Sequence, residues 1–115
     1  QLLHHDGKIY GTTGETGYLF CFDVQERSVV AAEEMGFGAG ALFGLKYRES
    51  DGVLYAISGH SLVRANPETC QTERIAAHPE LRYGLAFDAD SAYFCAGNNL
   101  MKCRLPTGHA ASTAP

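Results

Sequence analysis

The stretch that decides the fold is Tyr83–Gly108, which reads YGLAFDADSAYFCAGNNLMKCRLPTG. It holds three short apolar runs separated by polar turns rich in Asp, Asn and Gly. Runs of this length with such turns between them are typical of β-strands joined by hairpins. The same succession occurs twice more upstream, so the sequence predicts an all-β protein made of a repeated unit.

Three phrases carry the repeat. The first is Asp6–Gly11, which returns as Asp51–Ala56 and, more loosely, as Asp90–Cys95. The others are Leu19–Asp23 with Leu62–Asn66 and Leu100–Arg104, and Phe43–Tyr47 with Tyr83–Phe87. Their spacing is about 38–45 residues, which is the period of β-propeller blades. Helical repeats of this length need a long 3.6-residue periodicity, which the chain lacks. The alternative is a chance similarity of hairpins in another sandwich or barrel.

The pattern predicts antiparallel four-stranded β-propeller blades, two complete and one lacking its outer strand. The blades span roughly residues 1–40, 41–80 and 81–108 of a partial propeller over residues 1–108, followed by a flexible tail, 109–115. The apolar run Tyr18–Asp23 is expected to be buried on both faces. Asn98 and Asn99 are expected at a hairpin tip, because Asn tolerates left-handed backbone. The predicted strands are 1–4, 8–12, 18–23, 28–33, 41–47, 53–58, 61–65, 72–77, 83–87, 92–96 and 100–104.

Composition narrows the class of protein. Hydrophobic residues make up 45% of the chain and charged residues 19%, which is typical of a globular domain. No apolar run is long enough for a transmembrane helix, so no membrane partner is expected. The net charge is −4 without a Lys/Arg cluster, which argues against nucleic acid. Because the chain starts midway through a repeat, we expect a piece cut from a longer protein.

The cysteines leave two alternatives. Cys95 and Cys103 lie on opposite arms of a predicted hairpin, where a disulfide is conceivable in an oxidising compartment. Otherwise Cys21, Cys70 and these two are small buried hydrophobic residues. The compartment stays unknown, although free thiols would favour the cytoplasm.

Catalytic and metal motifs do not stand out. The adjacent His4 and His5 would point to opposite faces of a strand and could not chelate one ion together. Asp88 and Asp90 match an ordinary β-turn better than an acid–base pair. We therefore expect no metal and no cofactor. A ligand site, if the ring has one, is expected at the channel mouth beside the inner strands, with Phe37, Phe43, Arg82 and Tyr83 as its residues.

The phrases Asp51–Ala56 and Leu62–Thr69, preceded by Gly44 and Leu45, resemble blades of the large propeller superfamily that includes NHL-type, lactonase-type and quinoprotein-type propellers. The resemblance covers roughly residues 1–108 and implies the blade architecture, not a function. In this family the third strand of a blade typically ends in Asp-Pro-x-Thr-Gly. Asp23-Val24-Gln25 departs from this pattern because it has Val in place of the Pro. In lactonase-type propellers acidic and Asn side chains from several blades hold a metal, and no such ligands can be assigned here.

Two functions follow as expectations. The first is a non-catalytic propeller fragment that binds a ligand or protein and completes its ring by self-assembly, as a homo-oligomer. The alternative is a fragment of a propeller enzyme, of the lactonase, lyase or sugar dehydrogenase type, acting on a small or carbohydrate substrate. The missing blades of a longer chain would complete the ring equally well.

Overall fold

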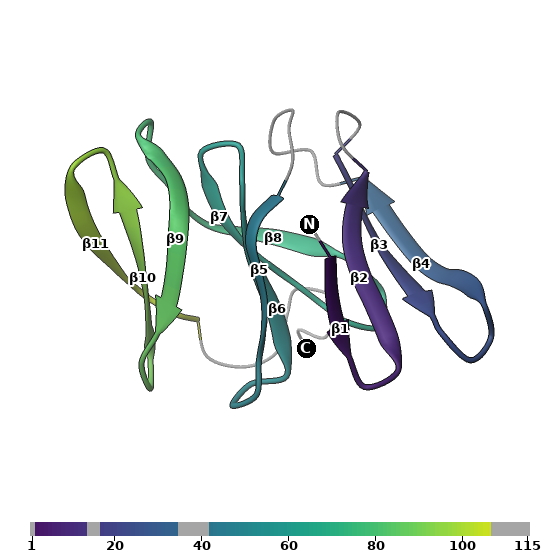
Figure 1. Cartoon of the computed structure of the whole chain (residues 1–115). Coiled ribbons are helices and arrows are strands. Elements are labelled where there is room, and N and C mark those ends of the chain that lie inside the picture. Colours follow the sequence, from purple (N-terminus) through teal and green to yellow (C-terminus); the bar gives the residue numbers. More distant parts are fainter. Residues whose placement is uncertain (1, 14–16, 35–41, 107–115) are drawn as a thin grey trace.

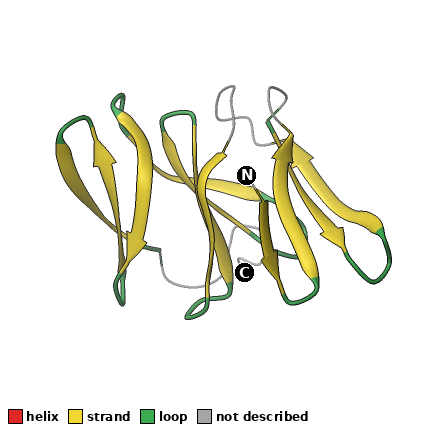
Figure 2. Cartoon of the chain, in the orientation of Figure 1, coloured by secondary structure: helices red, strands yellow, loops and turns green. Residues whose placement is uncertain are grey.

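Eleven antiparallel strands in three sheets make up the computed structural model, which describes residues 2–13, 17–34 and 42–106. Figures 1 and 2 show strands and turns, with no helix in these ranges. The expected all-β fold of two four-stranded sheets and one three-stranded sheet is confirmed. The sheets do not close into a ring within the described part of the chain.

The strands follow one another within each sheet. The first sheet contains β1 (Leu2–His5), β2 (Lys8–Thr13), β3 (Tyr18–Asp23) and β4 (Ser28–Glu34). The central sheet contains β5 (Leu42–Arg48), β6 (Val53–Ser58), β7 (Ser61–Ala65) and β8 (Thr72–Ala77). The third sheet contains β9 (Leu81–Phe87), β10 (Ser91–Ala96) and β11 (Asn99–Arg104).

Short turns set this order, and glycine makes several of them. Gly7 and Gly52 have positive φ in the turns between the first two strands of their sheets. Gly97 has a φ of 59° between β10 and β11, where Ala96 pairs with Asn99. The tip is therefore Gly97-Asn98, and Asn99 already belongs to the strand, which corrects the expected Asn98-Asn99 tip. Glycine fills this position because it adopts left-handed backbone without a steric penalty.

The core lies in two layers on either side of the central sheet. One layer joins it to the first sheet through residues such as Tyr10, Leu19, Leu45 and Val63. The other joins it to the third sheet through residues such as Tyr55, Leu62 and Leu85. Strands β6 and β7 are consequently buried along their whole length. The first strands β1, β5 and β9 lie in sequence across the molecule (Figure 1).

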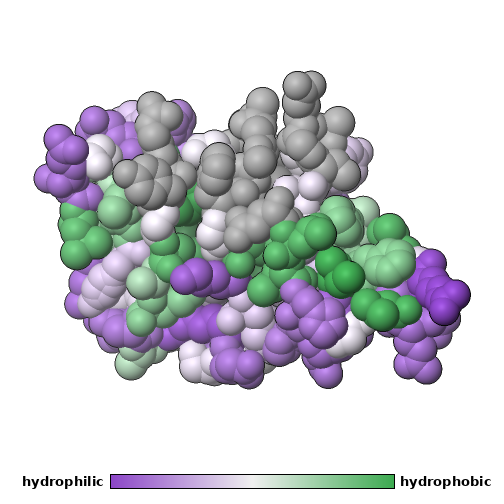
Figure 3. Space-filling model, viewed as in Figure 1, coloured by the Kyte–Doolittle hydropathy of each residue, from purple (hydrophilic) through white to green (hydrophobic). Residues whose placement is uncertain are grey.

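The expected two-sided burial of Tyr18–Asp23 is wrong. Leu19 and Cys21 are buried against the central sheet, whereas Tyr18 is exposed and Phe20 and Phe22 are half-buried. These three alternate with the buried pair and so lie on the outer face of the first sheet. No other described element packs there. Figure 3 shows apolar surface over the region where Figure 1 draws this sheet.

The register of the third sheet excludes the Cys95–Cys103 disulfide. Cys103 pairs with Ala92, whereas Cys95 pairs with Leu100. Ala92 and Cys95 are three residues apart on one strand, so their side chains point to opposite faces, and the two thiols do as well. All four cysteines are free; Cys21 and Cys70 are buried, and the other two are half-buried.

A one-residue shift separates the third copy of the first phrase from the other two. The hydroxyl of Tyr55 donates to Asp51 Oδ2, and that of Tyr93 donates to Asp88 Oδ2, both at 2.5 Å. Tyr55 pairs with Arg64 and Tyr93 with Lys102, two residues after Leu62 and Leu100 respectively. Tyr93 and Asp88 are therefore the counterparts of Tyr55 and Asp51, not Phe94 and Asp90 as the sequence alignment predicted.

Candidate binding groove

Three of the four residues expected at a channel mouth, Phe43, Arg82 and Tyr83, belong to the starts of β5 and β9. Phe37 lies outside the described residues, and so do the side chains of Phe43, Arg82 and Tyr83. Their strand positions are described: Phe43 pairs with Ile57, and Tyr83 pairs with Cys95. This site remains a prediction.

The crossover that precedes β9 is fixed by hydrogen bonds. Its backbone is tied to two neighbouring turns: His78 N donates to His60 O at 3.1 Å, and Gly97 N donates to Glu80 O at 3.0 Å. The His60 Nδ1 lies 3.0 Å from Leu81 O, and His78 Nδ1 accepts from Glu80 N at 3.0 Å. Both imidazoles thus have a structural partner in the crossover.

A groove of about 450 Å³ opens between the first and central sheets, at the end of the first sheet that carries the β1–β2 turn. It lies where the β1–β2 turn, the end of β5 and the β7–β8 turn meet, and Tyr10 contributes from β2. Its volume falls within the range of small-molecule pockets, about 300–1,000 Å³. The residues that line it are His5, Asp6, Lys8, Tyr10, Tyr47, Pro67 and Glu68.

Two contacts across the groove hold its walls together. The imidazole of His5 stacks on the ring of Tyr47, with centroids 3.6 Å apart and planes at 21°. The hydroxyl of Tyr10 donates to Pro67 O at 3.0 Å. Each contact joins the first sheet to the central one. The walls are therefore built into the packing of the two sheets.

The turns beside the groove depend on local side-chain hydrogen bonds. Asn66 Oδ1 accepts from the backbone N–H of Glu68 at 2.8 Å and of Thr69 at 3.2 Å. Asp23 Oδ1 likewise accepts from Glu26 N at 2.9 Å in the β3–β4 turn. Asn and Asp side chains favour such turns because they replace a missing backbone acceptor. Asn66 thus fixes the loop that carries Pro67 and Glu68.

The groove combines charges of both signs. Asp6 and Glu68 are exposed carboxylates, and the Lys8 ammonium lies 4.0 Å from Asp23 Oδ2. Burial raises the pKa of the Tyr10 hydroxyl well above its ordinary value, with a further contribution from Cys21. The Tyr10 hydroxyl is therefore a neutral hydrogen-bond donor at any physiological pH.

The thiols closest to this groove are poor nucleophiles. Burial raises the pKa of Cys70 to about 12, and burial also raises the pKa of Cys21. A protonated thiol is a weak nucleophile and a weak metal ligand. Among the described residues no three His, Cys, Asp or Glu side chains are grouped to hold a metal ion.

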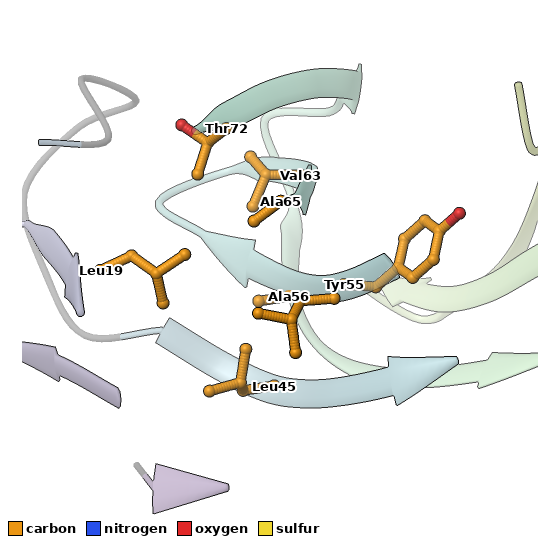
Figure 4. A pocket seen from close by; sticks show the side chains of 8 residues that line it. Leu19, Leu45, Tyr55, Ala56, Val63, Ala65 and Thr72 are labelled. Carbon is orange, nitrogen blue, oxygen red and sulfur yellow. The ribbon is translucent and has the colours of Figure 1, made fainter. Parts of the chain in front are cut away.

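A second, much smaller space separates the same two sheets. It measures about 10 Å³ and is lined by apolar side chains including Leu19, Leu45 and Val63 (Figure 4). It is a packing void with room for about one water molecule. Figure 4 also shows the Tyr55 side chain pointing to the other side of β6, toward the third sheet.

Polar contacts also join the central sheet to the third. Lys46 Nζ donates to Leu85 O at 2.7 Å. The guanidinium of Arg48 donates to the carbonyls of Asp88 and Ala89 at 3.0 and 2.6 Å, and forms an ion pair with Asp51 at 2.9 Å. These cations thus satisfy backbone carbonyls at the junction of the two sheets.

Asp88 and Asp90 form a turn, as the sequence predicted. Asp88 Oδ1 accepts from the backbone N–H of Asp90 and Ser91, while its other oxygen accepts from Tyr93. The hydrogen bond from Tyr93 lowers the pKa of Asp88 and raises that of Tyr93. His4 is exposed and His5 is half-buried, so the adjacent histidines face opposite sides as expected.

The groove was not predicted from the sequence. His5, Lys8 and Pro67 each look like ordinary turn residues, and nothing in their spacing brings them together. The stacked His5–Tyr47 pair arises only when two sheets pack face to face.

Comparisons with known proteins identify the fold alone. No family model matches the chain, and no curated protein matches it. Among solved structures, the computationally designed Ika4 protein matches with a TM-score of 0.62 and 15% sequence identity. The match covers 91% of this chain and 64% of the Ika4 chain, so this chain spans less than two thirds of the length of Ika4. In the described ranges no helix is long and apolar enough to cross a membrane.

Proposed function

We propose that the chain is part of a non-catalytic β-propeller, that it binds a small polar ligand, and that it completes its ring with a second copy. Several features support the blade interpretation. The strands of each sheet follow the chain order, and the sheets pack face to face through two apolar layers. The tyrosine–aspartate hydrogen bond at the second strand recurs in the central and third sheets.

The groove of about 450 Å³ is the observation that carries the binding function. Its stacked His5 and Tyr47 rings present aromatic surface, on which the apolar face of a sugar ring can pack. The carboxylates of Asp6 and Glu68 accept hydrogen bonds from hydroxyl groups, and the Lys8 ammonium donates them. A neutral carbohydrate therefore suits this lining better than a strongly charged ligand, because the groove carries both carboxylates and an ammonium group.

Ligand-observed NMR tests the binding function. The protein is screened by saturation transfer against a panel of neutral monosaccharides, with inorganic phosphate and acetate as charged probes. We expect transfer to at least one sugar and its loss in Tyr47→Ala. Tyr18→Ala is the matched control, because Tyr18 is an exposed aromatic residue of β3 outside the groove. Transfer that is equal in both variants, or absent for every sugar, contradicts the proposal.

Light scattering on a sizing column tests the self-assembly. The chain has a mass of 12.4 kDa. Two copies would bring together six sheets, which is within the typical range of four to eight blades. We expect twice the single-chain mass, and a single-chain species at all concentrations contradicts this part of the proposal.

A further inference from the structure

The two junctions between sheets are built around corresponding leucines. Leu19 of the first sheet and Leu45 of the central sheet lie in the same core layer and line the same void (Figure 4). Leu62 of the central sheet and Leu85 of the third sheet lie together in the other layer. All four are at most 6% exposed. Each junction thus pairs a leucine from the third strand of one sheet with one from the first strand of the next.

The register shows which residues correspond. Leu19, Leu62 and Leu100 are each the second residue of the third strand of their sheet. Tyr10, Tyr55 and Tyr93 each pair with the residue two places after that leucine. Leu3 pairs with Tyr10 and Lys46 pairs with Tyr55, so Leu2 and Leu45 each precede the partner of the corresponding tyrosine. Leu2 is therefore the first-sheet counterpart of Leu45, and Leu100 is the third-sheet counterpart of Leu19 and Leu62.

The end faces expose these counterparts. Leu100 is 76% exposed, whereas Leu19 and Leu62 are at most 1% exposed. Leu2 is 68% exposed, whereas Leu45 and Leu85 are at most 6% exposed. The end faces also carry larger apolar groups, since Phe20 and Phe22 lie beside Leu2 on the outer face of the first sheet. One chain thus presents both halves of an interface that it already makes twice internally.

We infer that a second copy of the chain covers these faces, with the outer face of the first sheet packed on the outer face of the partner copy's third sheet and Leu2 against Leu100. This inference rests on the proposed ring completion and names its contact surfaces. The interface is head-to-tail, because it joins two different faces. It continues the order of the sheets from one copy into the next.

Two single substitutions test the inference. Leu100→Glu and Leu2→Glu each place a charge on one face, and neither disturbs the single chain, because both side chains are largely exposed. Burying an unpaired carboxylate in an apolar interface is strongly unfavourable. We expect each variant alone to remain a single chain of 12.4 kDa at protein concentrations up to about 1 mM. A dissociation constant of about 1 mM corresponds to an interaction of about −4 kcal/mol. Val24→Glu, in the β3–β4 turn outside both faces, should assemble like the unmodified protein.

Mixing the two variants separates a head-to-tail interface from a symmetric one. The Leu100→Glu chain keeps an intact first-sheet face, and the Leu2→Glu chain keeps an intact third-sheet face. Their equimolar mixture should therefore form a 1:1 pair of twice the single-chain mass. A symmetric interface between two identical faces would leave one of the variants assembled on its own, and no new pair would form on mixing.

Thiol labelling gives a second readout. Cys95 is half-buried and pairs with Leu100, so assembly should cover it. We expect a maleimide to react with Cys95 at least tenfold more slowly in the assembled protein than in either single-chain variant. Leu2→Glu is the sharper case, because Leu2 belongs to a different sheet from Cys95 and can affect it only through a second copy.

The outcomes distinguish this inference from the proposed function. Assembly that survives both substitutions overturns the inference and leaves self-assembly standing. A single-chain species for the unmodified protein overturns both, and further blades of a longer chain would then cover the two faces. Loss of assembly in both variants, a new pair on mixing and faster labelling of Cys95 support the inference.

Discussion

The central sheet and the two end sheets have similar strands but different surroundings. Strands β6 and β7 are buried along their whole length, because a sheet packs on each side of them. Strands β3 and β11 occupy the position of β7 in the end sheets. Strand β3 is buried on one face only, and no residue of β11 is fully buried, because each of these sheets packs on the central sheet from one side. The packing of neighbours, and not the strand sequence alone, therefore decides how much each residue contributes to stability.

The same contrast appears in the polar contacts. Arg48 joins the central sheet to the third through the carbonyls of Asp88 and Ala89, and it forms an ion pair with Asp51 of its own sheet; its side chain is only 11% exposed. Arg104, at the end of β11, has an ion pair with Asp90 at 3.6 Å and is 83% exposed. Water screens the Arg104–Asp90 ion pair and competes with it for hydrogen bonds. The polar contacts of an arginine are thus expected to contribute more to stability at a junction between two sheets than on an end sheet.

The largest expected difference concerns the corresponding leucines. Leu62→Ala should lower the free energy of unfolding by about 2–5 kcal/mol, because it leaves a cavity in the layer between two sheets. Leu100→Ala should change it by less than about 0.5 kcal/mol, because the side chain is mostly in water already. Urea unfolding of both variants, each in the Leu2→Glu background so that association does not contribute, measures the difference. Similar losses would mean that the end sheet is covered even in a single chain.

The next prediction compares the two arginines. Arg48→Met should cost about 1.5–3 kcal/mol, because it removes charged hydrogen bonds to Asp88, Ala89 and Asp51. Arg104→Met should stay within about 0.5 kcal/mol. Raising the salt concentration should weaken the contribution of Arg104 more than that of Arg48, because the Arg104–Asp90 pair is solvated. An equal loss from both substitutions, measured by urea unfolding, would contradict the contrast between junction and end.

Local sequence predicted the strands well. The expected strand ranges agree with the eleven observed ones to within about two residues, because each turn has residues with a backbone reason to be there, such as Gly52 and Asn66. Such signals act over a few residues and are readable without knowing the rest of the fold. The order of strands in each sheet follows from the same short turns.

The errors arose where one residue changes a face. The third copy of the first phrase was aligned one place off, because its tyrosine follows the turn aspartate by five residues, whereas the tyrosine of the central sheet follows its aspartate by four. A shift of one residue moves every following side chain to the other face of a strand. For the same reason the facing of Cys95 and Cys103 could not be judged before the register was known.

The groove could not be predicted, because it depends on how two sheets pack. His5 and Tyr47 are 42 positions apart and come from different sheets, and their rings stack only because these sheets pack against each other. The expected site at the starts of β5 and β9 came from the fold resemblance alone. It stays a prediction, since the side chains of Phe43, Arg82 and Tyr83 lie outside the described part of the structure.

A smaller effect is expected at the junction beside the groove. Tyr10→Phe removes the hydrogen bond to Pro67 O and should cost about 0.5–1.5 kcal/mol, while the ring keeps its packing. Tyr18→Phe, at an exposed end-face position of the same sheet, is the matched control and should be neutral. Urea unfolding measures both. If Tyr10→Phe is also neutral, the hydroxyl does not help to hold the two sheets together.

The smallest effect concerns the exposed pair Tyr93 and Asp88 on the third sheet. The Tyr93 hydroxyl lowers the pKa of Asp88 below its ordinary value of 3.8, because the hydrogen bond favours the carboxylate. The sign follows from linkage: a carboxyl with a lowered pKa in the folded state stabilises the fold above pH 3.8, and this contribution is lost as the pH falls through the lowered pKa.

Tyr93→Phe should therefore raise the pKa of Asp88 toward 3.8 and weaken the pH dependence of stability in the acidic range. Carboxyl ¹³C titration by NMR measures the first effect, and urea midpoints across the acidic range measure the second. The backbone N–H groups of Asp90 and Ser91 still donate to Asp88, so part of the lowering should remain. An unchanged pKa in the variant would show that the turn backbone alone sets it, and that the tyrosine–aspartate contact of an end sheet contributes nothing of its own.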